Sequence, residues 1–173
     1  TAELEKDPDN VEARNDRAVA YLKLKEFGKA ETGFLAIEES HPGRYRTHAN
    51  LGVLYKKMGR FPDAAEHVRR SLKIQPEGHL GLGDYYVRMI DWLSDRGNVR
   101  AKTDKQNPRK RKKVTPPATN FLGIAYSSGS ASVATNGLIS REYLETLIKA
   151  DRSFADALVV LGDVLVHGGE DEL

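Results

Sequence analysis

Apolar side chains recur at helical spacing along residues 45–78, in two runs separated by a short turn. The first run contains Leu51 and Tyr55, and the turn follows at residues 58–60. The second run contains the apolar and small residues Phe61, Ala64, Ala65, Val68 and Leu72. Because positions three and four apart share one face of an α-helix, the pattern predicts two amphipathic helices that pack against each other.

Small and special residues fit this prediction. Gly52 lies within the first predicted helix, where glycine is about 1 kcal/mol less favourable than alanine. We therefore expect a close approach of the second helix at Gly52, with Ala64 on the facing side. Gly59 suits the left-handed conformation that often ends a helix, and Pro76 cannot continue the second helix.

The same pattern occurs 34 residues earlier. In residues 11–44 the equivalent positions are occupied by Ala18, Tyr21, Phe27, Ala30, Phe34 and Pro42. Two adjacent segments of equal length predict an all-α fold of the α-α superhelix type. In such a solenoid of antiparallel helix pairs, each repeat packs mainly on its neighbours.

The register is lost after residue 78. Residues 79–96 keep apolar residues at helical spacing and are followed by Gly97, whereas residues 98–117 have no such spacing and are predicted to form an inserted, flexible basic loop. A further helix is expected at about 118–127. Residues 79–140 would then form one irregular unit that carries the insertion. It has three helices where two are expected, which leaves the helix pairing open.

Helical spacing resumes in residues 141–150 and again in 154–166. The apolar residues of the first of these segments are Tyr143, Leu144, Leu147 and Ile148. We expect truncated repeats over residues 141–173 and the end of a preceding repeat over residues 1–10. The whole chain, residues 1–173, is thus predicted to be one solenoid and a fragment of a longer repeat protein.

The helix–turn–helix pattern of residues 45–78, with its Leu51-Gly52-x-x-Tyr55 motif, resembles a tetratricopeptide repeat. The resemblance implies a non-catalytic scaffold that binds a peptide or partner protein in a concave groove lined by the first helix of each repeat. The groove positions that it implies are Asn15, Val19, Leu22, Arg46, Asn50, Val53, Lys56 and Lys57. The cations among them favour an acidic partner, and the alternative is that they are solvated charges on a helix face.

The densest charge lies elsewhere. The chain has a net charge of +2, but residues 100–113 hold eight basic residues and one acidic residue. Five of the basic residues are consecutive: Arg109, Lys110, Arg111, Lys112 and Lys113. Such a run can contact phosphates, so nucleic-acid binding is the alternative function. A nuclear import signal or an ordinary solvated loop also fits, and no aromatic residue interleaves the run to stack on single strands.

Catalytic motifs are absent from the sequence. It has neither a Gly-x-x-x-x-Gly-Lys-Ser/Thr loop nor a His-Glu-x-x-His motif. It has no cysteine, and its five histidines are scattered. We therefore predict no enzyme activity, cofactor or metal site, although the chain could be a regulatory segment of a larger enzyme.

Location and association are predicted from the apolar segments. No apolar run reaches the roughly 18–20 residues of a membrane span, so no membrane partner is expected and a cytoplasmic location is favoured. Apolar helix faces at both ends of the chain lead us to expect that it can self-associate.

Overall fold

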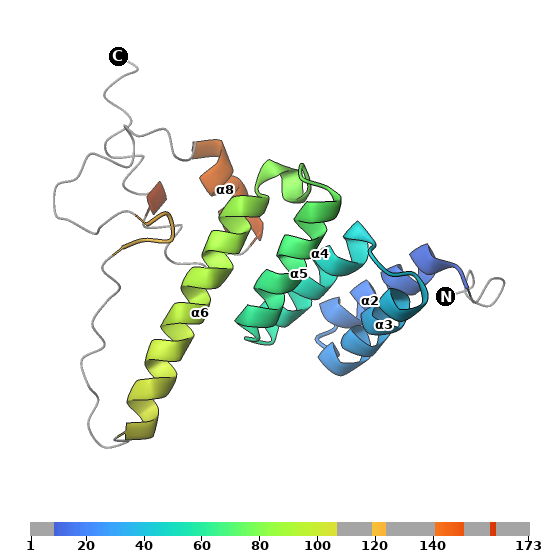
Figure 1. Ribbon diagram of the computed structural model, residues 1–173, viewed down its shortest axis with the longest axis horizontal. Coiled ribbons are helices and arrows are strands. Elements are labelled where there is room, and N and C mark those ends of the chain that lie inside the picture. Colours follow the sequence, from blue (N-terminus) through green and yellow to red (C-terminus); the bar gives the residue numbers. More distant parts are fainter. Residues whose placement is uncertain (1–8, 107–118, 124–140, 151–159, 162–173) are drawn as a thin grey trace, which may run out of the picture. The chain divides into compact units, whose positions relative to one another are not determined.

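The computed structural model describes residues 9–106, 119–123, 141–150 and 160–161 (Figure 1). Its helical elements are α2 (Val11–Lys23), α3 (Phe27–Ser40), α4 (Tyr45–Lys57), α5 (Phe61–Ile74), the short 3-10 helix η1 (His79–Gly81), α6 (Gly83–Gln106) and α8 (Arg141–Ala150). The chain divides into two compact units, Thr1–Ser94 and Asp95–Leu173. Among the described residues, no helix is both long enough and apolar enough to cross a membrane.

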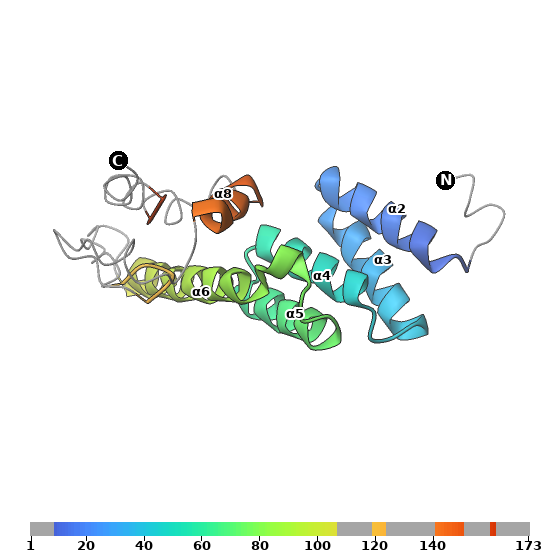
Figure 2. The ribbon, with the colours of Figure 1, turned by 90° about the horizontal axis from the view of Figure 1, so that it is seen from above.

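In the first unit the helices pack as successive pairs. Helix α2 packs against α3 and α4 packs against α5, and α4 also contacts both α2 and α3. Figure 1 shows the two pairs following each other, and the turned view in Figure 2 keeps the members of each pair next to each other. The predicted all-α fold of antiparallel helix pairs is therefore confirmed.

Local chemistry sets the helix ends. The Asn10 side chain caps α2 by accepting a hydrogen bond from the Ala13 N–H over 2.9 Å, which satisfies one of the free donors at a helix start. Pro62 lies in the first turn of α5, where its missing N–H is not needed. At the other end, α5 stops at Ile74, two residues before Pro76.

The core of each pair includes many of the apolar positions seen in the sequence, whereas Tyr21, Phe27, Phe61 and Leu72 are half-buried. Phe34, Leu51 and Val68 are completely buried. A Cβ atom added to Gly52 would lie 2.6 Å from Val68 Cγ2, a distance that real packing does not allow. The expected close approach of α5 to Gly52 is thus confirmed, and buried Ala64 contributes to it with its carbonyl oxygen 3.4 Å from the same position.

Two local predictions in the irregular segment are wrong. Helix α6 continues through Gly97 to Gln106, so residues 98–106 are helical and not part of a loop. A single glycine disfavours a helix by only about 1 kcal/mol, and the alanine, lysine, arginine and glutamine that follow are good helix formers. The helix ends two residues before Pro108, which disfavours helix both at its own position and at the preceding residue.

The second wrong prediction concerns the helix expected at about 118–127. Its described part, residues 119–123, is not helical and contains a turn at residues 121–122. The Leu122 N–H donates to Asn120 Oδ1 over 2.9 Å, a local bond that competes with helix formation. Gly123 has a φ of 82°, outside the right-handed helical region.

Helix α8 has the predicted bounds, and two of its predicted apolar residues, Leu144 and Leu147, are buried. Most of the helix expected at 154–166 lies outside the described residues, as do residues 1–8 and the predicted basic run.

Candidate functional site

Helices α2 and α4 carry all eight positions predicted to line a groove. The Asn50 Nδ2 group donates a hydrogen bond to Asn15 Oδ1 over 3.1 Å and so connects α4 to α2. Asn15 is 2% exposed and Leu22 is 7% exposed, so less than a tenth of either residue is open to a ligand. Asn50, Val19 and Val53 are half-buried. This part of the face therefore serves mainly to join one helix pair to the next.

Arg46 is part of an ion-pair network on the same face. Its guanidinium binds the Glu12 carboxylate and also donates to Asp16 Oδ1 over 3.2 Å. Arg44 binds the same Glu12. Because two carboxylates of α2 already pair with it, Arg46 is a connection between the helix pairs rather than an unpaired cation. The predicted groove omitted Asp16, because its ion pair with Arg46 depends on how closely α2 and α4 approach each other.

The two lysines at the end of α4 differ from each other. Lys56 is half-buried, and its Nζ lies 5.1 Å from the centre of the Tyr86 ring, in a cation–π contact. Lys57 is exposed and makes no ion pair with a described residue. Of the cations predicted to attract an acidic ligand, Lys57 therefore keeps its charge most available.

The turns after α2 and α4 have the same hydrogen-bond pattern. The Lys25 N–H donates to Leu22 O over 3.1 Å, and the Gly59 N–H donates to Lys56 O over 3.0 Å. This pattern ends a helix with a residue in the left-handed conformation, and φ is 62° at Lys25 and 74° at Gly59. Glycine adopts this conformation readily, whereas an L-residue is destabilised there by roughly 1–2 kcal/mol.

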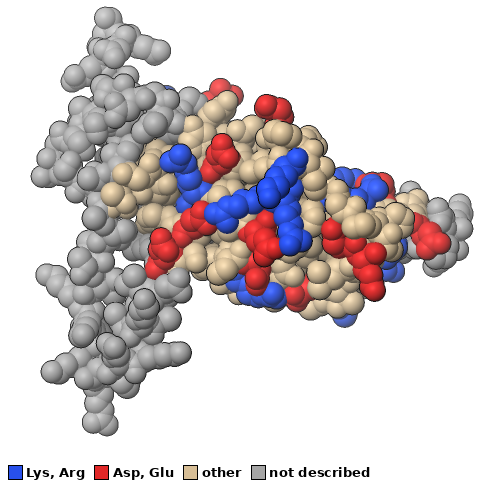
Figure 3. Space-filling view, in the orientation of Figure 1, with Lys and Arg blue, Asp and Glu red and all other residues tan. Residues whose placement is uncertain are grey.

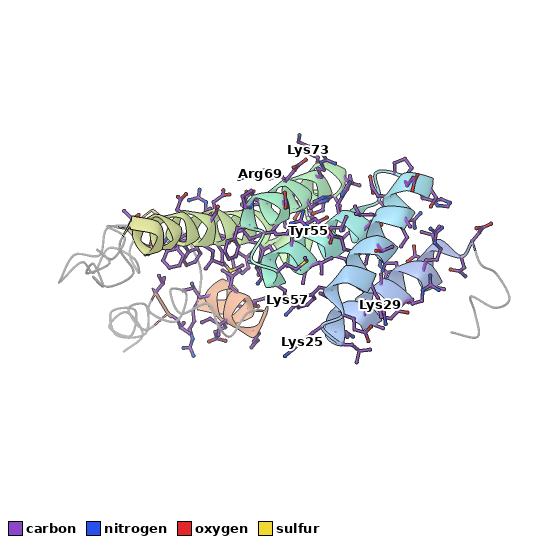
Figure 4. All side chains as sticks on the ribbon, turned by 90° about the horizontal axis from the view of Figure 1, so that it is seen from below. Lys25, Lys29, Tyr55, Lys57, Arg69 and Lys73 are labelled. Carbon is purple, nitrogen blue, oxygen red and sulfur yellow. The ribbon has the colours of Figure 1, made fainter. Side chains whose placement is uncertain are left out.

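These turns create a surface that we call the turn-edge patch. It consists of Lys23, Leu24, Lys25 and Lys57. Leu24 is 67% exposed, more than any other large hydrophobic residue in the described part of the chain. Lys23 and Lys57 end the first helices of successive pairs, and α2 contacts α4, so both lysines lie at the same edge. Figure 4 shows Lys25 and Lys57 at this edge and Arg69 and Lys73 at the opposite one.

Several other cations of the helix pairs are neutralised by carboxylates. Arg69 binds Asp91 over 2.6 Å, and Arg60 binds Glu31 over 2.7 Å. On the face seen in Figure 3, basic and acidic side chains lie next to each other. Within the described residues, Lys23, Lys25 and Lys57 make no such pairs. The turn-edge patch therefore combines unpaired positive charge with exposed apolar surface.

Comparison with models of protein families identifies the family to which the helix pairs belong. Residues 45–78 match a family model described as tetratricopeptide repeat, and residues 1–45 match a second model with the same description. Residues 1–78 belong to the tetratricopeptide repeat family. Searches of curated proteins and of solved structures gave no match. Tetratricopeptide repeats generally act as scaffolds for protein–protein interaction and are typically non-catalytic modules.

The two tetratricopeptide repeats carry only part of the predicted chemistry. The candidate phosphate contacts, Arg109–Lys113, lie outside the described residues. Among the described residues, no group of three histidine, aspartate or glutamate side chains is placed to hold a metal ion. Sequence reasoning missed the turn-edge patch, although one signal was present: Lys25 occupies the position that Gly59 fills in the next repeat.

Proposed function

We propose that the chain binds an acidic segment of another protein at the turn-edge patch, beside the exposed part of the α2–α4 face. The observation that carries the proposal is the exposed Leu24 at an edge with three lysines that have no described acidic partner. An acidic segment with an apolar side chain would cover the leucine and pair with the lysines, in the usual arrangement of an apolar contact within a polar rim.

The backbone at Lys25 supports this proposal. Its φ of 62° is a conformation that glycine adopts without strain, and the next repeat has glycine there. Lysine at this position therefore lowers the stability of the repeat by roughly 1–2 kcal/mol. Strained residues concentrate at functional sites, and a lysine side chain at the turn is a reason for the strain to be kept.

The charges on the rest of the α2–α4 face also favour the edge over the centre. Arg46 is occupied by Glu12 and Asp16. An acidic ligand at the centre would approach these two carboxylates and compete with them for one guanidinium. At the edge it would meet Lys57 and Lys25 without such competition. The acidic partner predicted from the sequence is thus retained, with a different set of contacts.

Charge reversal at two matched lysines tests the proposal. Lys57 and Lys73 are both exposed and both lie in the last turn of a helix, at opposite edges. Fluorescence anisotropy would measure the affinity of the full chain for arrayed 12-residue acidic peptides that contain one leucine, with charge-neutral scrambled peptides for comparison. Because an exposed ion pair contributes about 0.2–1 kcal/mol and reversal adds repulsion, we expect Lys57→Glu to weaken binding about 3- to 10-fold. Lys73→Glu should change it less than 2-fold.

Three results would contradict the proposal. Equal weakening by both variants would mean that binding depends on overall charge and not on this edge. Equal affinity for the neutral peptides would exclude an acidic ligand. Binding of single- or double-stranded nucleic acid that is stronger than any peptide binding and unaffected by Lys57→Glu would favour the basic run at residues 109–113.

A further inference from the structure

Three helices meet at a pair of histidines, of which His48 is buried and His67 is half-buried. His48 on α4 is 4% exposed, and its Nδ1 lies 3.0 Å from Nδ1 of His67 on α5. The other ring nitrogen of His48, Nε2, lies 3.3 Å from Glu38 Oε1 on α3. The pair therefore links the second helix of the first repeat to both helices of the second repeat. In the sequence, His48 and His67 are simply 19 residues apart, with no pattern that predicts their contact.

The distances define how many protons the cluster can hold. Two nitrogens 3.0 Å apart form a hydrogen bond only when one hydrogen lies between them. With neutral rings, we place one hydrogen on Nε2 of His48, which faces the Glu38 carboxylate, and one on Nδ1 of His67, which donates to Nδ1 of His48. One added proton still leaves a single hydrogen between the two Nδ1 atoms: on His67 it binds Nε2, and on His48 it binds Nδ1 while the hydrogen of His67 moves to Nε2. A second added proton puts two N–H groups face to face, so the contact must open.

The charges around the cluster come from all three helices. Burial lowers the pKa of both histidines, and each also lies near Arg70, which lowers it further. The carboxylates of Glu38 and Glu66 act in the opposite direction. Glu38 has its own fixed partner, because Oε1 accepts the Gly43 N–H over 2.9 Å. The ring of Tyr55, 5.3 Å from that of His67, closes the α4–α5 side.

We propose that Glu38, His48 and His67 form an acid-sensitive joint between the two tetratricopeptide repeats, closed at neutral pH and opened when both imidazoles are protonated. The sign follows from proton counting. The open state accepts two protons near the ordinary histidine pKa of about 6.5, whereas the closed state resists the second. Stability of the joint is therefore complete above about pH 7 and decreases as the pH falls through 6.5.

Hydrogen exchange of the full chain, followed by mass spectrometry at pH 7.5 and pH 5.5, tests this joint. After correction for the intrinsic pH dependence of exchange, protection of peptides from α4 and α5 should fall about 10- to 100-fold at the lower pH. The His67→Asn variant keeps a donor near the Nδ1 position but cannot be charged, so its protection should fall less than 10-fold. His41→Asn, the same change at an exposed histidine outside the cluster, should behave as the unmodified chain.

The possible outcomes separate clearly. A loss of protection below 3-fold in the unmodified chain, or an equal pH dependence in His67→Asn and His41→Asn, would overturn the proposal. If His67→Asn does not fold, the ring ¹⁵N shifts of the unmodified chain decide. Nε2–H on His48 together with Nδ1–H on His67 at pH 7.5 supports the joint, and any other pair of neutral tautomers contradicts it.

Discussion

Lys25 and Gly59 occupy the same position in successive repeats, and exchanging their residue types should have opposite effects on stability. Both close the same hydrogen-bonded turn, with φ values of 62° and 74°. A left-handed conformation disfavours an L-residue by roughly 1–2 kcal/mol relative to glycine. Lys25→Gly should therefore raise the free energy of unfolding by about 1 kcal/mol, and Gly59→Lys should lower it by a similar amount.

Few interactions other than the backbone conformation change in these two variants. A Cβ atom at Gly59 would lie in open space, so it causes no collision and the backbone conformation sets the main effect. Lys25 makes no ion pair with a described residue, so its removal breaks none. Lys25→Ala is the control that separates strain from charge, because alanine keeps the strain and loses the charge.

Urea unfolding followed by the fluorescence of Trp92, the only tryptophan, measures these differences. With a slope of about 1–2 kcal/mol per molar urea, Lys25→Gly should raise the midpoint by about 0.5–1 M, and Lys25→Ala should leave it almost unchanged. Both variants should lose affinity for the acidic peptides. If alanine stabilises as much as glycine, strain at Lys25 is not the cause. If Lys25→Gly stabilises but binds as before, the strain is real but Lys25 is not part of the binding surface.

Two further predictions concern packing and hydrogen bonding and use the same unfolding assay. Gly52→Ala should destabilise the protein by about 1–3 kcal/mol, because the new Cβ would lie 2.6 Å from Val68 Cγ2 and overpacking outweighs the better helix propensity of alanine. Gly28 has open space around it, so Gly28→Ala should be neutral or stabilising. The reasoning fails if the two variants have the same effect on stability. Tyr45→Phe should cost about 1 kcal/mol, because the phenol oxygen accepts the His79 N–H over 2.8 Å; no change in midpoint would mean that water replaces this bond.

The repeated part of the fold could be predicted from the sequence because its signals are local and occur twice. A small residue at the crossing, a left-handed turn and a helix stop recur with a spacing of 34 residues, and each has a physical role that does not depend on distant parts of the chain. The close approach at Gly52 followed from the penalty of placing glycine in a helix. This prediction requires only that a second helix is present, and not the position of its side chains.

The irregular segment lacks this redundancy. Gly97 was interpreted as a helix end, but no other stop signal accompanies it, and α6 continues to Gln106. Conversely, Pro116 and Pro117 precede the helical pattern around Leu122, as prolines often do at helix starts, but the Asn120 side chain forms a turn there. In both places one local preference competes with another, and the sequence does not show which is stronger.

The positions that a family resemblance assigns to a binding groove can be used by a particular chain to hold its repeats together. Here Asn50 donates a hydrogen bond to Asn15, and Arg46 forms ion pairs with two carboxylates. Each contact joins residues 30 to 35 positions apart and fixes the step from one repeat to the next. Because these contacts already use the Arg46 guanidinium, this face has little unpaired charge left to offer a ligand. We therefore expect recognition to depend on residues whose polar groups the fold does not use, such as Lys25 and Lys57 at the turns.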